Sequence, residues 1–557
     1  MKVLEGYRMW EKLAPEARVL VREALEKLSP AYDPERGLVG VTWDGKTHWA
    51  LRESLYYALG LLIRDGAAGA ATAERVCREV LALQMIDPDE VWHGCFRHPG
   101  DPQPPKMPVP WREVTLRARY QADLAWERIT ARFGELLADD PRRAETERLL
   151  QRALCDTVPV AWDTYEPNAR EFVGLPFAML LEHFSGLLPA DLIHAIEKSA
   201  HALMEGAIAR SESDFTPLNT NIRTILIFLL DWFGARLNEP EWQRMALREA
   251  ERFLAEYREY HAVAEFNSPT YCGVDLSMLG FWRRYGKQPE LRAAADELEA
   301  GIWRDMAEFY NPAMRNFSGP YSRAYELEMA IHTCFYDLLY LGLGAERFPW
   351  HPFSIESTNN PLLVLGNVHI PADAAERMLT PGPARSVRHS FRELSERGDP
   401  AHRNALCTAT AWIRPDRMIG ALSGSENPSH QLRPLVVFWR CGEALGTLRT
   451  GRCLPDGREC HLHTVFFDGE ASENRASLRI RNAAQQAVTF YLELQGPGIE
   501  DSVLTPERWE LPGLTVRVRS DLTLTPSVPA PGTLRLNAPL PADGSERRLE
   551  LELEEQS

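Results

Sequence analysis

The sequence predicts an α+β chain in which an N-terminal (α/α)6 toroid is followed by a C-terminal antiparallel β-sandwich. Helical periodicity fills residues 4–342, two kinds of helix alternate there, and short strand-like runs take over after about residue 345. A chain of 557 residues is longer than one ordinary core, so two domains are expected. We place the toroid at 1–345, an interdomain segment rich in Pro and Asn at 346–400, and the sandwich at 401–557.

The helical segments are separated by prolines and glycines, which end helices or start turns. They are expected at 4–28, 48–64, 72–86, 112–134, 141–158, 171–184, 190–210, 221–234, 239–260, 274–285, 289–310 and 323–342.

Alternate helices differ in their polarity. Residues 241–254 carry charges along one face, which must meet water, whereas residues 222–233 are apolar nearly all round and must be buried on every side. Pairs with one exposed and one buried member indicate two concentric layers, and six pairs fit a closed toroid. An open helical solenoid is the competing architecture, but no repeated consensus marks one.

The last part of the chain alternates in the strand period. Residues 405–413, 435–439, 488–494 and 514–518 are rich in β-branched and aromatic side chains, with turn residues between them. This spacing is typical of an antiparallel sandwich.

Polar, aromatic-rich motifs open every second helix of the first part. If these helices form an inner ring, the motifs gather at one mouth, which favours an enzyme. They are residues 43–48, 110–112, 219–221, 265–271 and 319–325.

Composition excludes several classes of protein. The formal net charge is −17 and no basic stripe is present, so we expect no nucleic-acid partner, although a local pocket can still hold an anionic substrate. Nine cysteines without a CxxC motif favour free thiols in a reducing compartment. The start lacks an apolar signal core and the longest apolar run, 225–230, is too short for a bilayer, so a cytoplasmic protein without membrane contact is expected.

The motif at 219–221 offers two amides. Asn219 can bind substrate or simply cap the next helix, and Thr220 can cap it too. Asn221 falls in the first turn of a buried helix, where its amide needs a partner such as a substrate carboxylate or hydroxyl.

The motif at 265–271 precedes an apolar helix. Pro269 stiffens it by restricting Ser268, so Tyr271 can be held in one pose as a catalytic group, while Glu265 and Asn267 are further candidates. The alternative is that Tyr271 is a packing aromatic.

The motif at 319–325 places Arg323 beside two phenols. A guanidinium there can lower a phenol pKa or bind a carboxylate. Tyr321 and Tyr325 are four residues apart and would share a helix face, with His332 about two turns further on. A lone helical His is more often a core residue.

A fourth group of candidate residues lies at 92–98, in the first domain. Aromatics stack on sugar rings and Arg binds anionic substituents, so this group is read as a site wall. Its candidates are Trp92, His93, Arg97 and His98. Their spacing matches no standard zinc pattern, and no phosphate loop or other cofactor motif occurs, so neither metal nor cofactor is expected.

With these motifs the chain resembles polysaccharide lyases built from an α/α toroid and an antiparallel β-sandwich, of the heparinase II/III-like and alginate-lyase-like kinds. The resemblance implies that an Asn at an inner helix start, here Asn221, neutralises a uronate carboxylate. It implies a Tyr one helix pair later, here Tyr271, as base, acid or both. It further implies charge-stabilising groups on the next inner helix, here Arg323, Tyr321 and Tyr325. It also implies a His from the sandwich side, for which His389 and His402 are candidates. The family's frequent Asn-His pair is replaced here by Asn219-Thr220-Asn221.

We therefore expect a β-eliminating lyase acting on uronic-acid-containing oligosaccharides or polysaccharides. The alternative is an inverting glycoside hydrolase, similar to a glucuronidase, on the same toroid, with Glu265 as acid and a second carboxylate. A third interpretation is a carbohydrate-binding or scaffold protein. The sequence leaves the sugar, the linkage and the oligomeric state open.

Overall fold

The computed structural model describes most of the chain in two compact units. The described residues are 9–43, 45–108, 110, 116–137, 140–213, 219–329, 334–349, 360–393, 405–427, 431–455, 457, 465–483 and 487–554. The first unit comprises Met1–Leu254, Val274–Glu297 and Tyr336–His369. The second comprises Ala255–Gly273, Leu298–Phe335 and Ile370–Ser557. The predicted boundaries at residues 345 and 400 stay a prediction.

Helices dominate the first two thirds of the chain, as the periodicity predicts. They are α1 (Met9–Lys12), α2 (Pro15–Leu28), α3 (Leu51–Asp65), α4 (Ala70–Leu81), α5 (Leu116–Leu136), α6 (Arg143–Thr157), α7 (Ala169–Phe184), α8 (Ala190–Ser213), α9 (Thr220–Leu237), α10 (Pro240–Tyr260), α11 (Cys272–Tyr285), α12 (Pro289–Phe309), α13 (Cys334–Leu343), α14 (Asn360–Leu363) and α15 (Ala372–Leu379).

The first unit contains an arc of buried helices. Helices α3, α7 and α9 pack on one another in turn, while α4 and α8 pack outside them. Helix α9 continues the arc to α11, because the rings of Phe228 and Phe281 meet at 5.8 Å. At the other end α2 packs on α3, and the Ala345 N–H just after α13 donates to Glu16 Oε1 of α2 at 3.1 Å. These contacts place the helices in two alternating layers, which is the arrangement of an α/α toroid.

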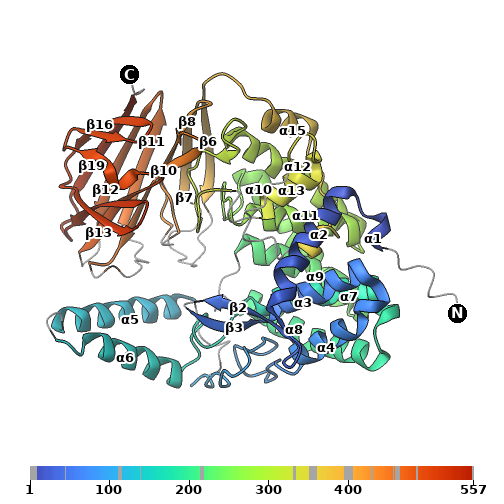
Figure 1. Cartoon of the computed structure of the whole chain (residues 1–557). Helices are drawn as coiled ribbons and strands as arrows, with labels where there is room; N and C mark the ends of the chain where they lie inside the picture. Colours follow the sequence, from blue (N-terminus) through green and yellow to red (C-terminus); the bar gives the residue numbers. More distant parts are fainter. Residues whose placement is uncertain are drawn as a thin grey trace. The chain divides into compact units, whose positions relative to one another are not determined.

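Helix α9 shows why the inner layer is buried all round. It is apolar on every face, and its residues from Ile225 to Leu230 are each at most 2% exposed. Helices α5 and α6 pack on each other as a hairpin (Figure 1).

A small antiparallel sheet precedes α3. Its strands are β1 (Tyr32–Asp33), β2 (Leu38–Trp43) and β3 (Lys46–Ala50). Of the polar motif predicted at 43–48, Trp43 ends β2 and pairs with Lys46 at the start of β3, and the following helix begins at Leu51.

The second unit contains two antiparallel sheets (Figure 1). One has the order β17-β18-β13-β10-β9-β8-β7-β6 and the other β11-β12-β19-β16-β15-β14. Their strands are β6 (Arg385–Glu393), β7 (Ala405–Ile413), β8 (Arg417–Ser423), β9 (Leu435–Cys441), β10 (Ala444–Cys453), β11 (Val465–Ser472), β12 (Arg475–Asn482), β13 (Val488–Gln495), β14 (Val503–Leu504), β15 (Arg508–Leu511), β16 (Leu514–Ser520), β17 (Thr525–Ala530), β18 (Thr533–Leu540) and β19 (Glu546–Glu554). A short hairpin of β4 (Tyr310–Asn311) and β5 (Asn316–Phe317) lies in the same unit.

The two sheets pack face to face. Strand β11 contacts β7 and β8, and alternate residues of β12 are buried, as expected for strands with one face in a core. The predicted fold class, a helical toroid-type part followed by an antiparallel β-sandwich, is confirmed.

Candidate active site

The loop between α10 and α11 is folded into successive turns that bury its polar side chains. The Ser268 N–H donates to the Glu265 carbonyl at 3.1 Å, and Ser268 Oγ accepts from the Tyr271 N–H at 3.1 Å. Asn267 adopts a left-handed φ of 53°, which Asn tolerates better than most residues. The loop thus presents Tyr271 in a fixed position at the beginning of α11.

The segment after β5 is held in place by the edge of the sandwich. Tyr321 forms a β-bridge with Arg433, and the Ala324 N–H donates to the Gln431 carbonyl at 3.0 Å. The Ser322 N–H donates to the Phe266 carbonyl of the α10–α11 loop at 3.2 Å. These bonds bring three distant segments of the second unit together.

Arg323 is the centre of this meeting point. Its Nη1 donates to Glu265 Oε1 at 3.1 Å and its Nε donates to Gln431 Oε1 at 2.6 Å. Its guanidinium carbon lies 4.1 Å from the centroid of the Tyr271 ring, and the Tyr271 hydroxyl donates to the same Gln431 oxygen at 3.4 Å. The ring of Tyr325 lies 6.0 Å from that of Tyr271. We call these five residues the Arg323 cluster.

The cluster is buried at one end and open at the other. Glu265 is fully buried, Tyr271 is 8% exposed and Tyr325 is 47% exposed. Burial raises the pKa of Tyr271 far above its usual value, and the lowering effect of Arg323 is smaller, while Tyr325 and Glu265 raise the pKa further. Tyr271 is therefore a neutral phenol, able to donate a proton.

The structure corrects the helix predicted at 323–342. Helix α13 begins only at Cys334, because residues 321–324 pair with the sandwich instead of forming a helical turn. Tyr321 and Tyr325 consequently do not share a helix face. Tyr321 is fully buried and its hydroxyl donates to the Phe317 carbonyl at 2.8 Å, which gives it a packing position. His332, predicted to bind substrate, lies outside the described residues, as does His402.

Gln431 was not predicted. It is 3% exposed, and its side-chain oxygen accepts from both Arg323 and Tyr271. It is 160 residues from Tyr271 in the sequence and belongs to no recognisable motif, so only the pairing of 321–324 with the sandwich reveals it.

Asn221 lies in the first unit, in the first turn of α9. Its side chain is 5% exposed, and the carboxamide oxygen has no hydrogen-bond partner among the described residues. Asn219 precedes the helix in extended conformation, and its side chain makes no capping hydrogen bond. The convergence of Asn221 with Tyr271 stays a prediction.

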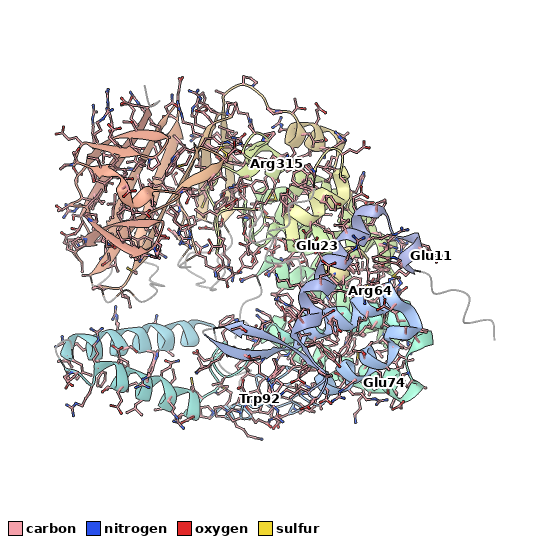
Figure 2. All side chains as sticks on the ribbon, in the orientation of Figure 1. Glu11, Glu23, Arg64, Glu74, Trp92 and Arg315 are labelled. Atoms are coloured by element: carbon pink, nitrogen blue, oxygen red, sulfur yellow. The ribbon has the colours of Figure 1, made fainter. Side chains whose placement is uncertain are left out.

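The group at 92–98 also lies in the first unit. Trp92 is fully buried in a core cluster and its Nε1 donates to the Pro105 carbonyl at 3.2 Å, so it packs rather than faces a ligand (Figure 2). His93 accepts the Asp87 N–H at Nδ1 and lies 3.3 Å from Glu205 at Nε2. Arg97 and His98 are exposed and bond to carbonyls of Asp101 and Trp49.

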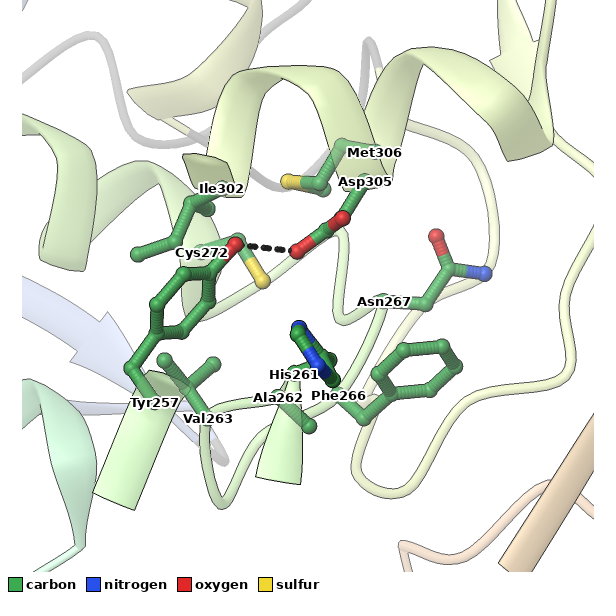
Figure 3. Close-up of a pocket in the computed structure, with 10 residues that line it drawn as sticks. All are labelled: Tyr257, His261, Ala262, Val263, Phe266, Asn267, Cys272, Ile302, Asp305 and Met306. Atoms are coloured by element: carbon green, nitrogen blue, oxygen red, sulfur yellow. Dashed lines mark hydrogen bonds between the residues drawn. The ribbon is translucent and has the colours of Figure 1, made fainter. Parts of the chain in front are cut away.

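A small pocket adjoins the α10–α11 loop (Figure 3). Its walls include Phe266 and Asn267 of that loop and Cys272 of α11, and the Tyr257 hydroxyl donates to the carboxylate of Asp305 across it. His389, the sandwich histidine that the resemblance suggested, lies nearby: its Nε2 is 2.8 Å from the His261 carbonyl and its ring is 5.3 Å from that of Phe266.

Among the described residues, no group of three or more His, Cys, Asp or Glu side chains is arranged to hold a metal ion. None of the helices that the structure describes is long and apolar enough to cross a membrane.

The chain matches a known family over residues 18–120 and 150–353, and it belongs to that family, which is described as Domain of unknown function (DUF8769). No curated protein matches the sequence significantly.

Several solved structures are similar to the chain over nearly its whole length. Heparinase III covers 97% of this chain and 85% of its own, at 10% identity and a TM-score of 0.34. The heparan sulfate lyase HepC from Pedobacter heparinus covers 97% of this chain and 88% of its own, at 9% identity and a TM-score of 0.32. The Streptomyces coelicolor A3 chondroitin AC lyase, solved with chondroitin sulphate, covers 97% of this chain and 96% of its own, at 10% identity and a TM-score of 0.33. The second and third of these structures are named as lyases.

Proposed function

We propose that the chain is a lyase that cleaves uronic-acid-containing oligosaccharides or polysaccharides by β-elimination. The observation that supports this most directly is the Arg323 cluster, in which a guanidinium lies 4.1 Å from the ring of a buried phenol and both bond to Gln431. Such an arrangement combines a proton donor with a fixed positive charge, and elimination next to a carboxylate needs both.

In the proposed reaction a proton leaves the carbon next to the uronate carboxylate, and the glycosidic oxygen on the neighbouring carbon departs. Tyr271 protonates that oxygen, because burial keeps its phenol neutral. Tyr325 is the exposed phenol of the cluster, and we assign it as the group that accepts the carbon-bound proton. Arg323 and the Asn221 amide are proposed to stabilise the charge that develops on the carboxylate.

The hydrolase alternative gives Glu265 the role of general acid. A general acid must reach the glycosidic oxygen, but Glu265 Oε1 is already engaged by Arg323 Nη1 at 3.1 Å. Glu265 is also fully buried, so it does not face a substrate. We therefore propose that Glu265 positions Arg323.

Tyr271→Phe tests the proposal. Loss of the phenolic proton should lower kcat about 10²- to 10⁴-fold, the usual contribution of a general acid. The assay follows the absorbance of the unsaturated uronate formed from heparan sulfate, chondroitin sulphate and alginate. Tyr336→Phe is the control, because it also removes a buried hydroxyl that donates to a carbonyl, that of Pro349 at 3.1 Å.

New reducing ends without unsaturated product would contradict a lyase and favour hydrolysis. In that case Glu265→Gln should be inactive and Tyr271→Phe partly active. If the chain is a lyase, Tyr271→Phe should be inactive and Glu265→Gln should keep part of its activity.

A further inference from the structure

An exposed tryptophan precedes the inner helix α7. The Trp162 side chain is 52% exposed, and its backbone has a left-handed φ of 68°. A residue other than Gly in this region costs about 1 kcal/mol or more, so the surrounding structure must hold it there. Such strain is most often found at functional sites.

Hydrogen bonds fix the turn that carries Trp162. The Trp162 N–H donates to the Tyr165 carbonyl at 2.7 Å, and the Val160 N–H donates to Thr164 Oγ1 at 2.8 Å. The Thr164 N–H in turn donates to the Val160 carbonyl at 2.8 Å. The indole is thus presented from a rigid turn, which lowers the entropy lost when a ligand stacks on it.

The turn lies where two inner helices of the first unit begin. Arg52, in the first turn of α3, has its guanidinium carbon 5.1 Å from the ring centroid of Phe172 in the first turn of α7. Helix α9 packs on α7 and also carries its buried amide, Asn221, in its first turn. Since α8 returns the chain between α7 and α9, these two helices begin at the same end.

Polar groups of the kind that bind sugar hydroxyls follow Trp162 closely in the sequence. Glu166 Oε1 accepts the Asn168 N–H at 2.9 Å, and burial raises the pKa of its carboxyl. The Asn168 side-chain oxygen accepts from Arg210 at 2.9 Å, and the Asp163 carboxylate accepts from Gln151 at 3.0 Å. A turn that carries an exposed aromatic side chain together with carboxyl and amide groups matches a pyranose, which has an apolar CH face and a polar rim.

We propose that the turn at 160–168 is a sugar-binding subsite in which the indole of Trp162 stacks on a pyranose ring of the substrate chain, with Glu166 hydrogen-bonded to a sugar hydroxyl. The choice of a saccharide as ligand rests on the proposed function. The subsite belongs to the first unit, and it predicts a preference for longer chains.

The test measures equilibrium binding rather than turnover. Chondroitin sulphate and heparan sulfate oligosaccharides, from disaccharide to decasaccharide, are titrated by calorimetry into the Tyr271→Phe protein with and without Trp162→Ala. We expect Trp162→Ala to weaken binding of the longer chains about fivefold to tenfold and to leave disaccharide binding unchanged. Trp162→Phe should restore part of the affinity. Phe133→Ala, which removes an exposed aromatic of α5, is the control.

Equal affinities of the Trp162→Ala and parent proteins at every chain length would overturn the subsite, even if Tyr271→Phe abolished product formation as proposed. Conversely, length-dependent binding that requires Trp162, in a protein that forms no unsaturated product, would support the subsite and contradict the lyase. An unchanged thermal midpoint of Trp162→Ala, expected for a half-exposed side chain, shows that the change in affinity is local.

Discussion

Burial decides the protonation state of Tyr271. From the sequence, the nearby Arg323 is expected to lower the phenol pKa, and in the structure it does act in that direction at 4.1 Å. Desolvation is larger, however, because the phenolate would lose its water at a position only 8% exposed. Sequence spacing can place a cation beside a phenol, but it cannot give the depth at which the pair lies. The assignment of Tyr271 as acid depends on that depth.

Glu393, at the end of β6, gives a prediction of stability against pH. It is 4% exposed, and burial raises its pKa to about 7 although Ser425 Oγ and the Glu426 N–H donate to it at 2.9 and 3.1 Å. Between about pH 4.5 and 7 the folded state holds a proton that the unfolded state has lost. The free energy of unfolding should therefore fall as pH rises through this window, by about 3 kcal/mol in total.

Glu393→Gln should abolish that fall, because the amide does not titrate. Urea unfolding at several pH values measures it, with the exposed Glu500→Gln as control. A variant that loses stability with pH as steeply as the parent between pH 4.5 and 7 would show that Glu393 is not the group responsible.

At the scale of elements, local sequence patterns predict a helix well where residues of the helix itself, such as a proline in its first turn, set its start. Helix α10 begins at Pro240 and α12 at Pro289, both prolines that the sequence marks as breaks, and the apolar run of α9 is buried as expected. The same method fails at 321–329. There the backbone bonds to residues 431–433, and no local pattern carries that information. Tertiary pairing overrides helix propensity at the segment that holds Arg323.

Gly420 of β8 supports this segment from the sheet. A Cβ atom built on Gly420 would lie 2.1 Å from the carbonyl carbon of Gly319, so only glycine allows the strand and the segment to approach this closely. Gly420→Ala should displace the segment that leads to Arg323. We expect the free energy of unfolding to drop by about 1–3 kcal/mol, as for overpacking, together with a loss of kcat.

Urea midpoints and initial rates of the variant measure both effects. Gly382→Ala is the control, because a Cβ there would meet no atom within 4 Å. Full activity and stability of Gly420→Ala would mean that the segment yields without consequence for Arg323.

At the scale of the whole molecule, the candidate site is discontinuous in sequence. Glu265 and Tyr271 precede α11, Arg323 follows β5, and Gln431 belongs to the sandwich. The alternation of helices predicts that the segment before α11 and the segment that holds Arg323 meet near a ring mouth, because inner helices recur at regular intervals. It does not predict the contribution of the sandwich, since a residue between strands has no periodic signal to connect it with a helix start. The sandwich therefore contributes Gln431 to the candidate site.

Gln431→Ala tests this contribution in the intact chain. The substitution removes the acceptor shared by Arg323 Nε and the Tyr271 hydroxyl, so both groups should lose their fixed positions while the phenol remains present. We expect kcat to fall about tenfold to a hundredfold with little change in KM, because orientation of the reacting groups is lost rather than affinity. Gln495→Ala, at a partly buried Gln of β13 in the same unit, should leave kcat unchanged. If Gln431→Ala kept the parent kcat, Glu265 and the packing of Tyr325 would suffice to hold Arg323 and Tyr271, and the sandwich would have no role in positioning them.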